Sequence, residues 1–383
     1  MNETIYMPVG EVCSSISDTY REKKNMVTLI NTSDVLEGRV LNHERVPNSN
    51  LKGQFKKTFQ RDDILYSEIR PQNRRFAYVD FSPIDYIAST KLMVIRAKKD
   101  VVSPKYLYYF LKNSSTVAEL QLLAETRSGT FPQITFSEVA NLTIPVPPLA
   151  VQEVIVQTMQ CLEDKTICNE QINDNLQQQA MSLYAEMFLN SSDSNVTSGT
   201  LSDIAVITMG QSPSGSSYNE DGVGEVFYQG RAEFGFRFPK RRLFTTEPKR
   251  IAEAGDVLLS VRAPVGDLNI AYERCCIGRG LGAIHSKTGH SSFVLYTMFA
   301  LRSQLDVFNG EGTVFGSINR DALNAIPIDI PPVTEIDQFE VVAHPIDELI
   351  RANYEENCRL EAIRDSLLPK LMSGEIDVSA VQL

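Results

Sequence analysis

The chain has 383 residues, of which 43% are apolar and 22% charged, and its formal net charge is −11. This is enough apolar material for two hydrophobic cores, and no run approaches the roughly 18 consecutive apolar residues of a membrane helix. No apolar run follows Met1, the six cysteines lack CxxC spacing and the four histidines are scattered. We therefore expect a cytoplasmic protein with no membrane span, no disulfide framework and no metal site.

The negative charge is concentrated in two segments. Residues 1–150 carry +3 and residues 195–333 carry −1, whereas residues 151–194 carry −6 and residues 334–383 carry −7. Phosphate binding depends on the local field rather than on the net charge. Overall acidity therefore does not exclude DNA as a ligand.

The two halves of the chain are related to each other. Residues 62–71 read DDILYSEIRP and residues 255–264 read GDVLLSVRAP. Further along, residues 134–148 read ITFSEVANLTIPVPP and residues 318–332 read INRDALNAIPIDIPP. The matches follow one another in the same order and the units are long, so the sequence predicts a duplicated domain and not a solenoid.

Each predicted domain mixes strands and helices. Residues 91–97 (KLMVIRA) and 256–264 (DVLLSVRAP) have the pattern of strands, and residues 103–113 and 291–304 have the pattern of short helices. The glycine-rich segment GRGLG at 278–282 lacks the spacing of a dinucleotide-binding loop. We interpret it as a strand or bulge that needs close backbone approach.

A long polar helix is predicted after each domain. Alternating steps of four and three residues give a heptad seam in each helix. The first seam consists of Ile155, Met159, Leu162, Thr166, Asn169, Asn173, Leu176, Ala180, Leu183 and Met187. The second seam consists of Phe339, Ala343, Ile346, Ile350, Asn353, Asn357, Leu360, Arg364, Leu367 and Leu371. Each helix could pack only on its own domain, or the two helices could pair with each other.

The asparagines favour pairing. If an approximate two-fold axis relates the domains, the helices are antiparallel, with Asn169 opposite Asn357 and Asn173 opposite Asn353. A buried amide fixes the register because a slipped alignment would leave it unsatisfied. The pair would then form a stiff spacer between the two domains.

The predicted fold class is α+β. It has two globular mixed α/β domains related by a pseudo-two-fold axis and separated by two long antiparallel coiled-coil helices. The first domain covers residues 1–150 and the second covers 195–333. The central helix and its linker cover 151–194, and the C-terminal helix and tail cover 334–383.

Basic side chains cluster in both domains and are candidates for DNA binding. In the first domain they are Lys52, Lys56, Lys57, Arg61, Arg70, Arg74 and Arg75. In the second domain they lie among aromatic and amide side chains, and the candidates are Tyr228, Gln229, Arg231, Arg237, Lys240, Arg241 and Arg242. Cations can follow a phosphate backbone while Arg and Gln reach base edges. The alternative for such a cluster is an ordinary solvated face.

Polar loops supply further candidates. Residues 128–130 match residues 311–313 in the other half, and residues 211–218 form a serine-rich loop. The candidates there are Ser128, Gly129, Thr130, Gly312, Thr313, Gln211, Ser212, Ser214, Ser216 and Tyr218. An ordinary turn is the alternative for each, because Gly, Ser and Pro are common in loops.

No catalytic motif accompanies these residues. The nearest match to a phosphate-cradling loop, GLGAIHSKT at 280–288, lacks a glycine before Lys287. The proline pairs lack the flanking residues of an amino-methyltransferase pocket, and no nucleophile and base stand out. The chain is therefore predicted to bind and not to catalyse.

Several of these features together resemble the specificity subunit of type I restriction-modification enzymes. They are the order of the half-repeats, the proline-rich exits PVPPL and DIPPV, the helices after them, and the segments MGQSPSGSSYNEDG and FYQGRAEFGFRFP. The resemblance covers essentially the whole chain, from VGEV at residue 9 and LSDI at residue 201 to SLLPKLMSGEID near the end. Its individual motifs are degenerate, and the duplicated arrangement carries the resemblance.

The resemblance implies a non-catalytic subunit that reads a bipartite, asymmetric sequence in double-stranded DNA, one half per domain. It also implies that the helices set the gap and dock two methyltransferase subunits that use S-adenosylmethionine. Two motor-nuclease subunits, which use ATP and Mg, would complete the complex, and this chain itself would hold no cofactor. Two other functions stay open: a coiled-coil adaptor with peptide- or glycan-binding domains, and a nuclease without a recognised motif.

Overall fold

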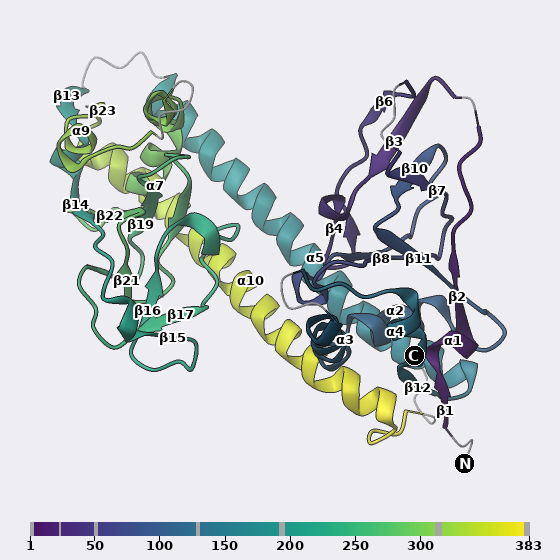
Figure 1. Cartoon of the computed structure of the whole chain (residues 1–383). Coiled ribbons are helices and arrows are strands. Elements are labelled where there is room, and N and C mark those ends of the chain that lie inside the picture. The colour runs from purple at the N-terminus through teal and green to yellow at the C-terminus, as the bar shows by residue number, and fades with distance from the viewer. Residues whose placement is uncertain are drawn as a thin grey trace. The chain divides into compact units, whose positions relative to one another are not determined.

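The computed structural model describes residues 4–22, 24–49, 53–127, 131–190, 196–310 and 316–378. The chain forms two compact units. The first unit contains residues 1–168 and 356–383, and the second contains residues 169–355. Each unit therefore has a globular domain and a part of each long helix, α5 (Leu149–Tyr184) and α10 (Val333–Ser373), which are teal and yellow in Figure 1.

The first globular domain runs from β1 to β12. Its strands are β1 (Ile5–Pro8), β2 (Cys13–Ile16), β3 (Met26–Ile30), β4 (Val35–Leu36), β5 (Arg39–Val40), β6 (Arg45–Pro47), β7 (Phe55–Lys57), β8 (Ile64–Ser67), β9 (Phe76–Tyr78), β10 (Tyr86–Ser89), β11 (Leu92–Ala97) and β12 (Thr143–Val146). Its α-helices are α1 (Val9–Val12), α2 (Pro104–Lys112), α3 (Ser114–Arg127) and α4 (Phe136–Asn141).

The second globular domain runs from β13 to β23. Its strands are β13 (Thr197–Thr200), β14 (Ala205–Met209), β15 (Tyr218–Asn219), β16 (Glu225–Tyr228), β17 (Leu243–Thr245), β18 (Ile251–Ala252), β19 (Val257–Ser260), β20 (Leu268–Ile270), β21 (Cys275–Ile277), β22 (Leu281–Ser286) and β23 (Pro327–Ile330). Its α-helices are α6 (Leu201–Ile204), α7 (Ser291–Ala300), α8 (Arg302–Asp306) and α9 (Arg320–Asn324).

The structure confirms the predicted duplication. One sheet has the order β2-β11-β8-β9 in the first domain and β14-β22-β19-β20 in the second, and the pair β1-β12 recurs as β13-β23. The two sequence matches also meet in the same way. The amide of Ile134 bonds to the Glu68 carbonyl at 2.9 Å, and the amide of Ile318 bonds to the Val261 carbonyl at 3.1 Å. The repeat therefore encodes a common scaffold.

The predicted local elements are also confirmed. The strands at 91–97 and 256–264 are β11 and β19, and the helices at 103–113 and 291–304 are α2 and α7 followed by α8. Both strands are buried on both faces, because successive side chains point in opposite directions into two different apolar clusters. Because α2 begins at Pro104, its first position lacks a donor that the helix would leave unsatisfied anyway.

The two domains differ in their second sheets. The first domain has a four-stranded sheet of order β6-β3-β10-β7, and the second has a five-stranded sheet of order β15-β17-β16-β21-β18. Each sheet lies over a separate small apolar cluster, one around Val79 and Leu92 and the other around Tyr228 and Ala283. The duplicated scaffold thus carries two unlike additions.

The long helices pair antiparallel in each unit. In the first unit, Ile155 and Met159 of α5 share a core with Leu368 and Leu371 of α10. In the second unit, Ala180 and Tyr184 of α5, which continues into a π-helix at Ala185–Leu189, share a core with residues 336–343 of α10. The start of α5 therefore contacts the end of α10 in the first unit, and the end of α5 contacts the start of α10 in the second unit. No residue of either predicted seam is exposed, so the seam prediction is confirmed.

The asparagines take part in this packing. Asn353 donates its amide to Asn173 Oδ1 at 2.8 Å, and Asn173 donates to the Ile350 carbonyl at 3.4 Å. The predicted pair of Asn173 and Asn353 is therefore confirmed. Asn169 is fully buried, and Asn357 donates to the carbonyl of Thr166 at 3.4 Å. Asn169 and Asn357 belong to different units, and their mutual pairing stays a prediction.

The compact units do not coincide with the predicted segments at 151–194 and 334–383. Each long helix is instead divided between the units, at Cys168 and Asn169 in α5 and at Glu355 and Glu356 in α10. The physical reason is that the apolar face of each helix completes the core of both domains.

Replacement of the Asn173–Asn353 pair should show energetic coupling. Asn173→Leu alone leaves the Asn353 amide without its acceptor, and Asn353→Leu alone leaves the Asn173 oxygen without its donor. Each single change should cost about 1–3 kcal/mol, and the double change should cost less than the sum. Urea denaturation of the four proteins measures this, and Gln171→Leu on the exposed face of α5 serves as the control. Strictly additive losses would contradict the pairing.

Candidate DNA interface

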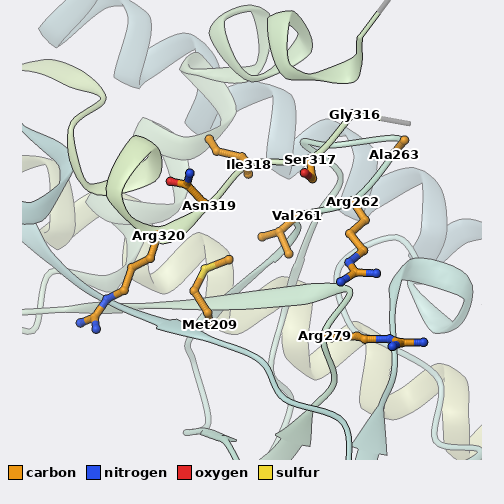
Figure 2. A pocket seen from close by; sticks show the side chains of 10 residues that line it. All are labelled: Met209, Val261, Arg262, Ala263, Arg279, Gly316, Ser317, Ile318, Asn319 and Arg320. Carbon is orange, nitrogen blue, oxygen red and sulfur yellow. The ribbon is translucent and has the colours of Figure 1, made fainter. Parts of the chain in front are cut away.

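The second unit contains a cavity of about 670 Å³ whose lining residues come from segments far apart in the chain. They are Met209, Val261, Arg262, Ala263, Arg279, Gly316, Ser317, Ile318, Asn319 and Arg320. Figure 2 shows Arg262 and Arg279 on one side and Arg320 on the other, with Met209 and Val261 between them. Cationic groups therefore flank a partly apolar floor.

Backbone hydrogen bonds hold the segments around this cavity. After β19 ends, the Val261 amide bonds to the Gly280 carbonyl at 3.0 Å, and the Ala263 amide bonds to the Gly316 carbonyl at 3.0 Å. Asn319 then begins α9, because its side chain accepts from the Ala322 amide at 2.9 Å. These bonds fix where the chain presents the side chains on either side.

Glycines allow another segment to approach the cavity edge. A Cβ on Gly278 would lie 2.8 Å from the Gln229 Cα, and one on Gly280 would lie 2.7 Å from the Gln229 carbonyl oxygen. The amide of Arg279, between them, donates to Ser212 Oγ at 3.2 Å. The prediction of close backbone approach at GRGLG is therefore confirmed. It brings two candidate residues, Ser212 and Gln229, next to Arg279.

Among the residues that the structure describes, the three cavity arginines have no carboxylate partner. Arg262, Arg279 and Arg320 are exposed, and within the described ranges none of their side chains forms an ion pair or a hydrogen bond. A guanidinium group that is not paired keeps its full charge for an incoming phosphate. Binding of that phosphate would release the counterions of the DNA. The cavity is therefore the strongest candidate in this unit for contact with a polyanion.

Other arginines of the second unit are paired. Among the predicted residues, Arg231 pairs with Asp267, Arg241 Nε lies 2.5 Å from Glu273 Oε1, and Arg242 Nη2 lies 2.5 Å from Glu233 Oε1. Each carboxylate compensates much of the local positive charge. These three arginines would have to exchange one anion for another to bind DNA, and their role in binding stays a prediction.

Two predicted contact residues are wrong as surface residues. The Arg237 side chain is only 3% exposed, and its guanidinium group bonds to Asp347, Gln177 and Tyr296. Tyr228 is 1% exposed and donates its hydroxyl to the Pro239 carbonyl at 3.4 Å. A cluster of basic and aromatic residues in the sequence does not reveal which side chains point into the core. Here both Arg237 and Tyr228 are buried.

The remaining polar candidates of the second unit lie at or near its surface. Ser214 and Ser216 are exposed with their hydroxyls 2.8 Å apart, and Tyr218 is half-buried against Phe227 and donates to the Pro213 carbonyl. The side chains of Gln211, Gln229 and Lys240 are exposed, and within the described segments they form no hydrogen bond or ion pair. Their contacts with DNA stay predictions.

The first unit has a different set of free cations. Lys56, Arg61 and Arg70 are exposed, and in the part of the chain that the structure describes their side chains form no hydrogen bond or ion pair. Arg74 donates to Ser114 Oγ at 2.9 Å, and Arg75 donates to the Ser33 carbonyl at 2.9 Å.

Lys57 is held more firmly. It is half-buried and donates to the Leu92 carbonyl at 2.8 Å, and its burial lowers the pKa of its ammonium group. The candidates that lie outside the described residues are Lys52, Ser128, Gly129, Thr130, Gly312 and Thr313.

At two of the three cavity arginines, the matched position in the first domain has an apolar residue. Where the second domain has Arg262, the first has Ile69, and where the second has Arg320, the first has Phe136. The search for clusters of basic residues in the sequence did not find these arginines, because each is isolated in the sequence. A comparison of the two half-repeats could have found them, since a cation replaces an apolar residue on a shared backbone.

Within the described part of the chain, no group of three or more His, Cys, Asp or Glu side chains is placed to hold a metal ion. Among the described helices, none is long and apolar enough to cross a membrane.

Two copies of one α+β scaffold, with unlike second sheets and exposed cations on each, have the features of a nucleic-acid-binding protein with two domains. The model of the type I restriction modification DNA specificity domain matches twice, at residues 6–178 and 193–357. The chain belongs to this family, and its function is to recognise specific DNA sequences for a type I restriction-modification system.

Individual relatives agree with this assignment. The protein named as the MjaX type I restriction enzyme specificity subunit of Methanocaldococcus jannaschii is 30% identical over 336 residues, which are 82% of this chain and 79% of that protein. The HindI specificity subunit of Haemophilus influenzae is 40% identical over 177 residues, which are 46% of this chain and 39% of that protein.

Solved structures share the fold. A chain from a study of complex assembly and conformational transition in the type I system has 25% identity and a TM-score of 0.50, over 97% of this chain and 98% of that one. The specificity subunit from M. genitalium has 16% identity and a TM-score of 0.53, over 98% and 97% of the two chains. The latter likeness concerns the fold alone.

The close approach at Gly278 gives a testable prediction. Gly278→Ala should destabilise the second unit by about 1–3 kcal/mol, because the new methyl group overlaps the backbone of Gln229. Gly215→Ala is the matched control, since a Cβ there meets nothing within 4 Å. Thermal unfolding compares the two variants. Equal melting temperatures would show that the segments at 229 and 278 separate easily.

Proposed function

We propose that each domain reads one half of a bipartite, asymmetric DNA target, and that Arg262, Arg279 and Arg320 hold backbone phosphates of the second half-site. The observation that carries this proposal is the set of three unpaired guanidinium groups around one cavity. Such contacts place the domain on the duplex, and neighbouring polar side chains such as Gln211 and Gln229 reach towards base edges.

In the first domain, Lys56, Arg61 and Arg70 supply the equivalent phosphate contacts. Arg70 matches Ala263, which lines the cavity next to Arg262, whereas Lys56 and Arg61 lie outside the matched segments, and the second sheets differ as well. Two surfaces with unlike cations and unlike loops favour unlike sequences. This asymmetry supports a target whose two halves differ.

The long helices set the gap between the half-sites and dock the catalytic partners. Apolar side chains on the outer face of α10 support docking: Val341, Val342 and Leu349 have 75%, 48% and 47% of their surface exposed. Exposed apolar groups on one helix face are suited to a protein partner. The partners proposed here are two methyltransferase subunits and two motor-nuclease subunits, in the cytoplasm.

Catalysis resides in those partners. The methyltransferase subunits use S-adenosylmethionine and the motor-nuclease subunits use ATP and Mg, while this chain supplies recognition and holds no cofactor. The acidic helices and the free cations of the domains are suited to these separate roles, one towards protein and the other towards DNA.

The cavity arginines can be tested by charge removal. In a complex with the methyltransferase partners, Arg262→Ala, Arg279→Ala and Arg320→Ala should each lower the slope of log affinity against log salt by about 1, because each removes one phosphate contact. Arg242→Ala is the matched control, since its guanidinium group is already paired with Glu233. Titration of a labelled target duplex at several salt concentrations measures the slopes.

A larger change for Arg242→Ala than for the three cavity variants would contradict the assignment of the interface. Absence of DNA binding by the wild-type complex would favour the adaptor alternative.

The spacer role can be tested by length. Insertion of one heptad into both α5 and α10, at matched positions of the seams, keeps the apolar stripe and adds about 10 Å of helix. The insertion should lengthen the gap in the methylated target by about 3 base pairs and leave both half-sites unchanged. Sequencing of methylated adenines in cells that express the complex reads out both. An unchanged gap would show that the helices do not set it.

A further inference from the structure

A buried polar cluster ties residues 229–242 to both long helices. These residues form the loop between β16 and β17, which we call the recognition segment. The centre of the cluster is Arg237, in this loop. The guanidinium group bonds to Asp347 Oδ1 on α10 at 3.1 Å and to Gln177 Oε1 on α5 at 3.0 Å. It also lies 3.4 Å from the hydroxyl of Tyr296 on α7. One side chain thus joins four segments of the same unit.

Because Arg237 is buried, its guanidinium group depends on partners at fixed positions. Its side chain is 3% exposed and that of Asp347 is 15% exposed. A charge removed from water is tolerated only with partners at fixed positions. The planar guanidinium group bonds in more than one direction at once, which a lysine ammonium group on a flexible stem does less well. The rings of Tyr296 and Phe299 enclose it, with centroids 5.8 and 5.7 Å from its central carbon.

Hydrogen bonds also tie this loop to β20, at the edge of the sheet that both domains share. The carbonyl of Arg237 accepts from the Ile270 amide at 2.8 Å, and Asn269 donates its side-chain amide to the Gly235 carbonyl at 2.9 Å. Next to it, Phe238 packs against Tyr272 and against Tyr354 of α10, at 5.6 and 4.9 Å between ring centroids. The loop is therefore fixed from both sides.

A second aromatic contact repeats this attachment. Tyr272 donates to Glu355 at 3.0 Å, and the Arg351 guanidinium carbon lies 4.6 Å from its ring centroid. Glu355 and Arg351 both lie on α10. The recognition segment and the residues after β20 therefore share one attachment surface on that helix.

The first domain has a carboxylate at the equivalent place on its long helix, but a different cation pairs with it. Tyr109 of α2 donates to Glu163 on α5 at 2.9 Å, just as Tyr296 of α7 donates to Asp347 on α10 at 2.9 Å. The two tyrosines occupy matched positions in α2 and α7, and the two carboxylates lie six residues before Asn169 and Asn353 respectively. Burial raises the pKa of both tyrosines, so that each hydroxyl remains a donor.

The cation that completes this arrangement comes from different places. In the first domain it is Lys112, at the end of α2 itself, which pairs with Glu163. In the second domain it is Arg237, from the loop that lies between two strands of the second sheet. In the first domain, Glu163 therefore binds two side chains of α2. In the second domain, Asp347 binds α7 and also the recognition segment.

We propose that Arg237 is a positioning residue for the second half-site, acting through Asp347 and Gln177 to fix the recognition loop on the helix pair. This inference rests on the proposed function, since it concerns the half-site that the second domain reads. Arg237 itself touches no DNA. Its loss would let the loop and the adjoining sheet move relative to the cavity arginines, which would blur base selection in one half of the target and spare the other.

The test uses the complex with its methyltransferase partners and a duplex library randomised at both half-sites. For Arg237→Ala, we expect the base preferences of the first half-site to be unchanged and those of the second half-site to weaken at least tenfold. Arg237→Lys restores the charge without the multiple bonds, and should recover part of the preference. Lys112→Met is the matched control in the first domain, and should leave the second half-site unchanged.

Asp347→Asn guards against a variant that fails to fold, since it keeps the size of the side chain and weakens the same contact. It should weaken selection at the second half-site only. If Arg237→Ala and Asp347→Asn bind the library with wild-type preferences at the second half-site, the positioning role is overturned. If the wild-type complex itself selects no sequence at either half-site, the proposed function fails instead, so the two failures are distinguishable.

Discussion

The burial of the apolar faces of α5 and α10 is the constraint on which the rest of the structure depends. Neither globular domain completes its core alone: Ile155 and Leu371 belong to the core of the first unit, and Ala180 and Phe339 to that of the second. A helix that serves two cores cannot slide without disturbing both. The partly buried bond between Asn173 and Asn353 adds a polar contact that is satisfied in one alignment only.

On this shared base, the two domains have diverged where they face solvent. Their first sheets have the same strand order, and the two matched segments meet through the same backbone bonds. Their second sheets differ, and single positions such as Ile69 and Arg262 have exchanged an apolar side chain for a cation. A scaffold that conserves its backbone bonds can change its surface chemistry at little cost in stability, which is what reading two different DNA sequences requires.

The sequence was sufficient for the features that repeat, and insufficient for those that depend on side-chain direction. The duplication, the heptad seams and the pair of Asn173 and Asn353 follow from repeated sequence patterns, because buried positions recur at regular intervals along the chain. The state of a single arginine does not follow from any period. Arg237 and Arg242 stand five residues apart in one basic cluster, yet one is buried and the other is exposed and paired. The unpaired arginines lie outside the clusters and become a group only in three dimensions.

The different origin of the cations at Glu163 and Asp347 has a consequence for how such proteins can be recombined. A domain with the first arrangement carries its counter-ion on the scaffold and is self-sufficient. Placed on α10, a foreign recognition segment must bring its own basic side chain to the position of Arg237, or Asp347 is left as a largely buried anion that keeps the Tyr296 hydroxyl bond but has no cation. The exchange of domains between such proteins is thus limited by a single charge where the domain contacts α10.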